Sequence, residues 1–137
     1  MNIKSLLAHK FFPVLVVCYT LFIAWVSLAK LIFTPNIHIE GGDKIGHAIA
    51  YFVLTVLWFL AIYVSRKANV VLSFSRTLMI VAFLGCGYGL LMEYLQKELT
   101  DYRMFDWLDA LANTTGIIFA VVLLKIVENK LISYIVD

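Results

Sequence analysis

The chain has 137 residues, of which 63% are apolar and 15% are charged, and its formal net charge is +2. This apolar share is too high for a soluble domain of that length, so the composition predicts an integral membrane protein with one domain over residues 1–137. The small and scattered positive charge does not indicate nucleic-acid binding. The expected partners are therefore membrane lipids or lipid-linked molecules, and no nucleic acid.

Four apolar runs are long enough to cross the hydrocarbon core, which takes about 20 helical residues at about 1.5 Å per residue. They extend over residues 11–33, 47–64, 77–95 and 108–127. The connections between them are short and polar, which favours antiparallel neighbours. The predicted fold is an all-α membrane protein, a bundle of four transmembrane helices.

The first run also has features of a cleavable signal peptide. Ser27-Leu28-Ala29 resembles a small-residue cleavage site after a basic start. The apolar stretch is, however, about twice as long as the core of a usual signal peptide. A retained transmembrane span is therefore the favoured interpretation.

Basic residues beside the spans predict the orientation, because cytoplasmic flanks are enriched in Lys and Arg. The N-terminus, the segment 65–76 and the C-terminal end together hold seven basic and two acidic residues. The opposite flanks hold four basic and seven acidic residues. Both termini are thus predicted to be cytoplasmic, and the polar residues of the opposite flanks face outward.

The second run begins with polar residues along one helical stripe. Asp43, His47 and Tyr51 are each four residues apart, and Lys44 precedes His47 by three. Asp43 is also a good helix N-cap, which is its simpler explanation. His47 lies about one turn inside the helix, where a bond to a neighbouring helix and a chemical role are both open.

The third and fourth runs carry polar residues at the same outer depth. Glu93 and Gln96 share one face of the third run, and Asp106, Asp109 and Asn113 share one side of the fourth. A carboxylate facing lipid costs up to about 3 kcal/mol, so Glu93 should face protein. The helix dipole favours an acid in a first turn by about 0.3 to 1 kcal/mol, which explains Asp106 but not Asn113.

Polar residues at one depth on three helices avoid the free-energy cost of contact with lipid if their side chains point at one another. This predicts a polar cleft at the extracytoplasmic face. Arg103, directly before the fourth run, would add a planar group suited to phosphate or carboxylate, and Lys44 a point charge. A purely structural hydrogen-bond network and a working pocket both remain open.

The polar positions form three separated motifs between about residues 40 and 120. In chain order they are Asp43-Lys44-x-x-His47-x-x-x-Tyr51, Glu93-x-x-Gln96 and Arg103-x-x-Asp106-x-x-Asp109-x-x-x-Asn113-x-x-Gly116. This pattern resembles the VanZ-like family of small bacterial membrane proteins, which is named after a teicoplanin-resistance protein. The resemblance implies a multi-pass protein of the bacterial inner membrane that lowers glycopeptide susceptibility. Thr115, where the family would have a smaller or more apolar residue, departs from the pattern.

The first functional hypothesis is binding of an anionic lipid or a lipid-linked cell-wall precursor in the outward cleft. Such a ligand carries phosphates or a terminal carboxylate that basic groups can recognise. The residues expected to bind it are Asp43, Lys44, Tyr51, Gln96, Arg103, Asp106 and Asn113.

The second hypothesis is a membrane enzyme that hydrolyses or modifies a lipid phosphate or headgroup. His47 would serve as a general base with Glu93 and Asp109 as carboxylates. There is no metal-binding signature with tight spacing and no Gly-x-Ser-x-Gly motif, so neither metal nor cofactor is predicted, although these carboxylates suit a hard divalent cation.

A structural or scaffolding subunit is the third hypothesis. Gly85 and Gly89 form a Gly-x-x-x-Gly motif that permits close helix packing, within the chain or in a homo-oligomer. A transporter is disfavoured, because the polar groups lie at one end of the spans and almost none at the midplane.

Overall fold

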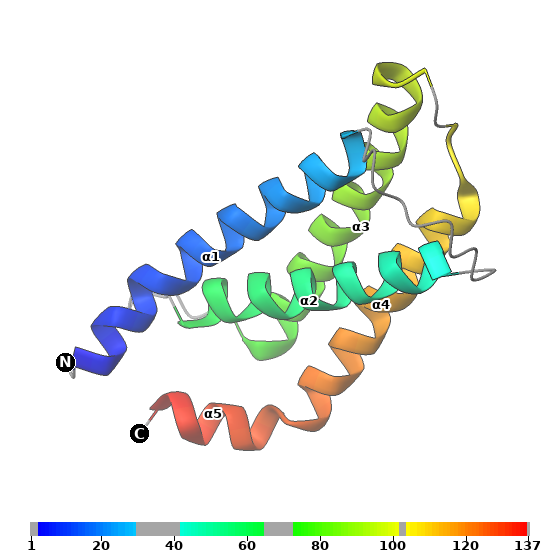
Figure 1. The fold of residues 1–137 in the computed structure, drawn as a ribbon. Coiled ribbons are helices and arrows are strands. Elements are labelled where there is room, and N and C mark those ends of the chain that lie inside the picture. Colours follow the sequence, from blue (N-terminus) through cyan, green and yellow to red (C-terminus); the bar gives the residue numbers. More distant parts are fainter. Residues whose placement is uncertain (1–2, 30–41, 65–72, 102–103, 137) are drawn as a thin grey trace.

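A computed structural model of the chain describes residues 3–29, 42–64, 73–101 and 104–136. These residues form helices and no strand. The helices are α1 (Ile3–Leu28), α2 (Gly42–Val64), α3 (Phe74–Leu99), α4 (Trp107–Ile126) and α5 (Glu128–Val136) (Figure 1).

The four long helices α1 to α4 each contain a segment long and apolar enough to cross a membrane. The prediction of an all-α chain with four such helices is therefore confirmed, and these helices support a multi-pass membrane protein. Apolar side chains cover much of their outer surface, including Phe83 on α3 and Phe119 on α4. Such a surface suits contact with lipid tails.

The helix ends differ from the predicted ends of the apolar runs. Helix α2 begins at Gly42, five residues before the predicted start, and α3 extends from Phe74 to Leu99 instead of from 77 to 95. Hydropathy marks the apolar part of each helix, whereas polar turns continue the same backbone hydrogen bonds beyond it. Helix α1 ends at Leu28, five residues before the predicted end, and residues 30–33 of that prediction lie outside the described part of the chain.

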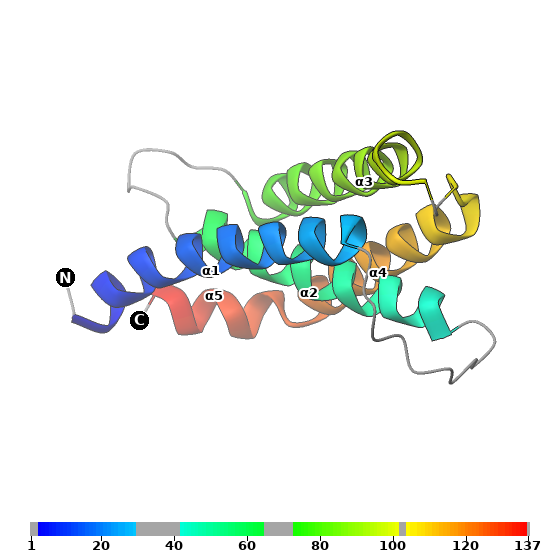
Figure 2. The same cartoon turned by 45° about the horizontal axis from the view of Figure 1, so that its top comes forward.

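A short fifth helix follows α4 and was not predicted. Val127 forms the C-cap of α4, and α5 begins at the next residue. In Figures 1 and 2, α5 turns away from α4 and ends beside the start of α1. The start of α1 and the end of α5 therefore lie at one end of the bundle, while the orientation of that end stays a prediction.

Helix α2 lies at the centre of the bundle and contacts α1, α3 and α4. Helix α1 is attached through Thr20, whose hydroxyl accepts the indole N–H of Trp58 at 3.0 Å and whose carbonyl accepts the hydroxyl of Tyr88 at 2.7 Å. Two clusters of buried apolar side chains fill the space between the helices. Their most buried members are Phe59, Val81, Leu54 and Ile117.

The Gly85 and Gly89 face of α3 packs inside the chain. A Cβ atom at position 85 would lie 3.1 Å from Ile117 Cδ1, and one at position 89 would lie 3.2 Å from Tyr51 Cε1. Both glycines are buried, so they admit neighbouring side chains of the same molecule. These glycines therefore permit close packing within the chain, and a homo-oligomer stays a prediction.

Candidate functional site

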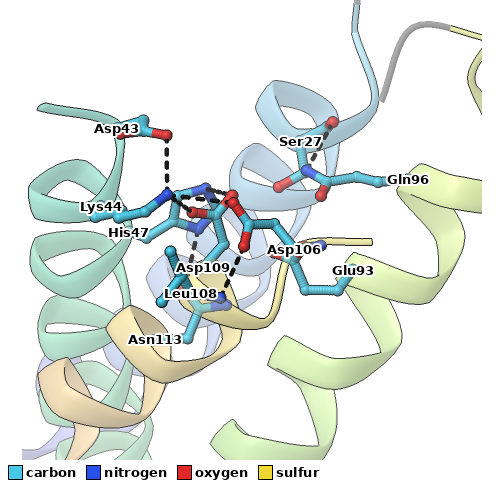
Figure 3. Close-up of polar contacts among 10 residues, drawn as sticks. All are labelled: Ser27, Asp43, Lys44, His47, Glu93, Gln96, Asp106, Leu108, Asp109 and Asn113. Carbon is cyan, nitrogen blue, oxygen red and sulfur yellow. Dashed lines mark hydrogen bonds and ion pairs between the residues drawn. The ribbon is translucent and has the colours of Figure 1, made fainter. Parts of the chain in front are cut away.

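Polar side chains gather at the end of the bundle where α2 and α4 begin and α3 ends (Figure 3). They come from three helices, as the sequence predicted. We call this set the polar cluster, and its members are Asp43, Lys44, His47, Glu93, Asp106, Asp109 and Asn113.

Asp106 directly precedes α4 and has two separate roles. It is the N-cap residue, and its Oδ1 accepts the Leu108 N–H at 2.8 Å. Its other carboxylate oxygen, Oδ2, accepts a hydrogen bond from Lys44 Nζ at 3.2 Å. The bond from the Leu108 N–H and then the Lys44 ammonium lower the pKa of Asp106 from its ordinary value of 3.8. The acid predicted to favour the helix dipole is thus also a member of the site.

Lys44 joins the start of α2 to the start of α4. Its Nζ lies 3.0 Å from Asp109 Oδ1, 3.2 Å from Asp106 Oδ2 and 3.4 Å from Asp43 Oδ2. Figure 3 shows the ammonium group among these oxygens. An ammonium has three hydrogens to donate, and three carboxylates face them. Lys44 is therefore neutralised within the protein, unlike the free point charge expected from the sequence.

His47 lies one turn further into α2, between two side chains of α4. Its Nδ1 lies 3.0 Å from Asn113 Oδ1, and its Nε2 lies 3.6 Å from Asp109 Oδ2. The two ring nitrogens thus face two different side chains of α4, an amide and a carboxylate.

Glu93 is the most deeply buried carboxylate of the polar cluster, with only 1% of its surface exposed. Its Oε2 accepts the Asp106 N–H at 3.5 Å, which is longer than a good hydrogen bond of about 2.9 Å. Its Oε1 has no hydrogen-bond partner among the described residues. Buried carboxylates are normally paired, so this oxygen requires an explanation.

Three potential metal ligands lie close together in the polar cluster. One atom each of His47, Glu93 and Asp109 lies within 4.8 Å of the other two. The described part of the cluster contains the carboxylates of Asp43, Glu93, Asp106 and Asp109 but only one ammonium, that of Lys44. With these carboxylates ionised, the site carries an excess of negative charge.

A cavity of about 700 Å³ adjoins the polar cluster. Side chains of α1, including Phe22, Ile23 and Val26, line it together with His47 and Asp109. One wall is thus mainly apolar and the other is polar and charged. A molecule with an apolar part and a polar headgroup matches both walls.

Two further predicted site residues, Gln96 and Tyr51, line the cavity. Gln96 Nε2 also donates to the carbonyl oxygen of Ser27 at 3.1 Å and so ties α3 to α1. Tyr51 is 2% exposed, and its ring lies against that of Tyr88 with centroids 6.2 Å apart. Arg103 lies outside the described residues.

The α1 wall of the cavity was missed in the sequence. Tyr19 lines it and donates its hydroxyl to the carbonyl oxygen of Ala50 at 3.3 Å. Tyr19, Ile23 and Val26 have the spacing of one helical face, and Ser27 lies beside them. That spacing was the signal in the sequence for a cavity wall on α1. Because the whole run is apolar, however, the sequence does not distinguish this helical face from the others.

The fold and the site define a membrane protein with four long apolar helices and a polar cluster at one end of the bundle. No family model matches the chain, and no solved structure matches it. It is similar to an uncharacterized protein of Schizosaccharomyces pombe, with 33% identity over 102 residues. The match covers 74% of this chain and 57% of that relative, so the chain spans little more than half of the relative's length. Membership of the VanZ-like family stays a prediction.

Proposed function

We propose that the protein binds an anionic lipid or lipid-linked precursor, with the headgroup at the polar cluster and the apolar chains along α1. The observation that supports this proposal is the cavity of about 700 Å³ between the two kinds of wall. Its volume lies within the range of about 300 to 1,000 Å³ that is usual for small-molecule sites. Phe22 and Val26 would contact the apolar chains, and His47 and Asp109 would lie near the headgroup.

The depth of the polar cluster favours a membrane lipid over a water-soluble ligand. His47 and Asp109 lie within the first two turns of helices that are apolar enough to span a membrane. A lipid headgroup lies at that level, and its chains can leave the site directly into the bilayer. A phosphate-bearing lipid is the preferred ligand, because its polar headgroup and apolar chains match the two walls of the cavity.

The proposal is tested by filling the cavity. Gly46 lines it, and a Cβ atom at that position would meet no atom within 4 Å, so Gly46→Leu adds bulk without a clash at Cβ. Gly87 on α3 is equally open and does not line the cavity, so Gly87→Leu is the matched control. Both replacements also favour the helix, by up to about 1 kcal/mol.

The measurement is equilibrium binding of fluorescently labelled phosphatidic acid to the protein in a non-ionic detergent. We expect Gly46→Leu to weaken binding by about tenfold or more, which corresponds to about 1.4 kcal/mol, and Gly87→Leu to leave it unchanged. Labelled phosphatidylcholine of the same chain length tests the preference for an anionic headgroup. Equal phosphatidic acid binding by the two variants would contradict the proposal.

Turnover of the bound lipid is a second candidate function. It is favoured by the imidazole of His47 beside the Asp109 carboxylate, a pair of groups typical of general acid/base catalysis. The test is release of phosphate or headgroup from bound phosphatidic acid, and the reaction should be lost in His47→Gln. Binding without any release in the wild type would exclude this function for that lipid.

The resemblance to the VanZ-like family extends the proposal to the bacterial inner membrane. A protein that binds a lipid-linked cell-wall precursor changes how much of it is accessible to glycopeptides. Expression in a sensitive host should then lower teicoplanin susceptibility, and Gly46→Leu should restore it. If the wild type is present in the membrane and the inhibitory concentration of teicoplanin does not change, the extension to glycopeptide susceptibility is contradicted. The proposal of lipid binding is not affected by that result.

A further inference from the structure

Glu93, whose Oε1 has no hydrogen-bond partner among the described residues, lies beside two other potential ligands, His47 and Asp109. We infer that these three side chains bind one divalent first-row metal ion, Zn²⁺ or Mn²⁺, which in turn binds the lipid phosphate. The role of the ion toward phosphate rests on the proposed function, whereas the metal site itself does not.

The donor atoms have suitable positions. The three ligand atoms lie within 4.8 Å of one another, and His47 Nε2 lies 3.6 Å from Asp109 Oδ2. Ligands at about 2.0 to 2.2 Å from one ion are at most about 4.4 Å apart, so a small rotation of the Glu93 or Asp109 side chain is sufficient. Glu93 Oε1 has no other partner among the described residues, which leaves it available.

Neighbouring groups already orient each ligand. His47 Nδ1 lies 3.0 Å from Asn113 Oδ1, and this contact directs Nε2 away from Asn113. Lys44 holds Asp109 Oδ1 at 3.0 Å and leaves Oδ2 for the ion. The Asp106 N–H contacts Glu93 Oε2. Hydrogen bonds of this kind orient the ligands in protein metal sites, and their loss typically weakens metal binding by about 10- to 100-fold.

The charge balance of the site also favours a cation. Only the Lys44 ammonium faces the carboxylates of the described polar cluster, and it is shared by Asp43, Asp106 and Asp109. A divalent ion would compensate the negative charge of these three carboxylates that Lys44 leaves over. Three protein ligands also leave coordination positions for phosphate oxygens. The ion would thereby give an acidic site its affinity for an anionic lipid.

The donor set distinguishes between metals. One imidazole and two carboxylates suit Zn²⁺ or Mn²⁺, whereas Ca²⁺ and Mg²⁺ prefer oxygen ligands. The test is therefore titration of the full chain, purified in a non-ionic detergent without added lipid, with Mn²⁺, Zn²⁺ and Mg²⁺ by calorimetry. Mn²⁺ binding is also followed by the loss of its free electron paramagnetic resonance signal.

We expect one ion per chain in the wild type and a loss of affinity of at least 100-fold in Glu93→Gln. The control is Glu98→Gln, because Glu98 is an exposed carboxylate of the same helix that pairs with Lys97 and lies outside the polar cluster and the cavity. Its affinity should remain within about threefold of the wild type, which is less than 0.7 kcal/mol. No saturable binding by the wild type, or equal affinity in Glu93→Gln, would overturn the metal site. Tighter binding of Mg²⁺ than of Mn²⁺ and Zn²⁺ would overturn the role of the imidazole.

Thermal unfolding separates loss of the site from loss of the fold. Added Mn²⁺ should raise the unfolding temperature of the wild type, because a ligand that binds only the folded state stabilises it. Metal-free Glu93→Gln should unfold near the wild-type temperature, since glutamine has a similar shape and its amide oxygen can still accept the Asp106 N–H, and Mn²⁺ should not raise this temperature. His47→Gln is a second variant with the same expectation for Mn²⁺. A full Mn²⁺-induced rise in both variants would overturn the site.

Phosphatidic acid binding is then compared with Mn²⁺ and with EDTA. If Mn²⁺ binds as expected but phosphatidic acid never binds, the proposed function fails and the metal site stands. If phosphatidic acid binds equally tightly in EDTA, the role of the ion toward phosphate is overturned. We expect binding at least tenfold tighter with Mn²⁺.

Discussion

Gly116 of α4 packs directly against the backbone of Ala48 in α2. A Cβ atom at position 116 would lie 3.0 Å from the Ala48 Cα and would overlap the Ala48 carbonyl group. This contact lies one residue from His47 along α2 and three residues from Asn113 along α4. It therefore sets the helix spacing at which those two side chains form their hydrogen bond.

Gly116→Ala should destabilise the protein by about 1 to 3 kcal/mol, because the added methyl forces α4 away from α2. The measurement is thermal or denaturant unfolding in detergent. Gly87→Ala is the control, since its Cβ would meet no atom within 4 Å, and it should stabilise by up to about 1 kcal/mol. Equal stability of the two variants would contradict the close packing of α2 and α4.

The number and type of helices could be predicted because hydropathy is a local property of the sequence. An apolar run of about 20 residues has few alternatives to a membrane helix. The helix ends could not be predicted from hydropathy, because the polar residue Lys44 belongs to α2 and contacts acids of the start of α4. The connection between α4 and α5 depends on packing and also gave no apolar signal.

The residues of the polar cluster could be predicted from helical spacing. Which of their side chains contact each other could not. His47, Asp109 and Asn113 each lie on a polar stripe that the sequence displays. Which atoms meet depends on the distance between α2 and α4, which Gly116 sets through a contact 68 residues away in sequence. The neutralisation of Lys44 by acids of α4 is a consequence of that geometry.

Thr20→Val tests the attachment of α1 to the bundle. The change preserves shape but removes the hydroxyl that accepts the Trp58 indole N–H, so we expect destabilisation by about 1 kcal/mol. Thr114→Val is the control, because that hydroxyl donates only to the Ala110 carbonyl of its own helix. Unfolding temperatures of the two variants are compared. A larger loss in Thr114→Val than in Thr20→Val would contradict this role.

Asp106 should make the stability of the protein dependent on acidic pH. Its pKa is lowered in the folded state by the Leu108 N–H and by Lys44 on α2, while Asp43 on α2 acts in the opposite direction. A lowered pKa contributes stability above the unfolded-state value of 3.8, and this contribution is lost as pH falls through the folded-state pKa. The loss therefore begins near pH 3.8 and is complete below the folded-state pKa.

The variant that isolates this effect is Asp106→Asn, because asparagine is also a good N-cap and keeps the helix start. The free energy of unfolding of wild type and variant is measured in detergent from neutral pH to below pH 3.8. We expect the stability advantage of the wild type to shrink as pH falls. A difference that stays constant over this range would show that the Asp106 carboxylate does not contribute in this way.

Cysteine labelling tests the predicted orientation, which rests on the distribution of basic residues. Met104 precedes α4 and is 86% exposed, and Lys130 is exposed on α5 at the other end of the bundle. Each is replaced by cysteine in a chain carrying Cys18→Ala and Cys86→Ala. In intact bacterial cells, a membrane-impermeant maleimide should label Met104→Cys directly and Lys130→Cys only after permeabilisation. The reverse pattern would place the polar cluster at the cytoplasmic face and would contradict binding of an extracytoplasmic headgroup.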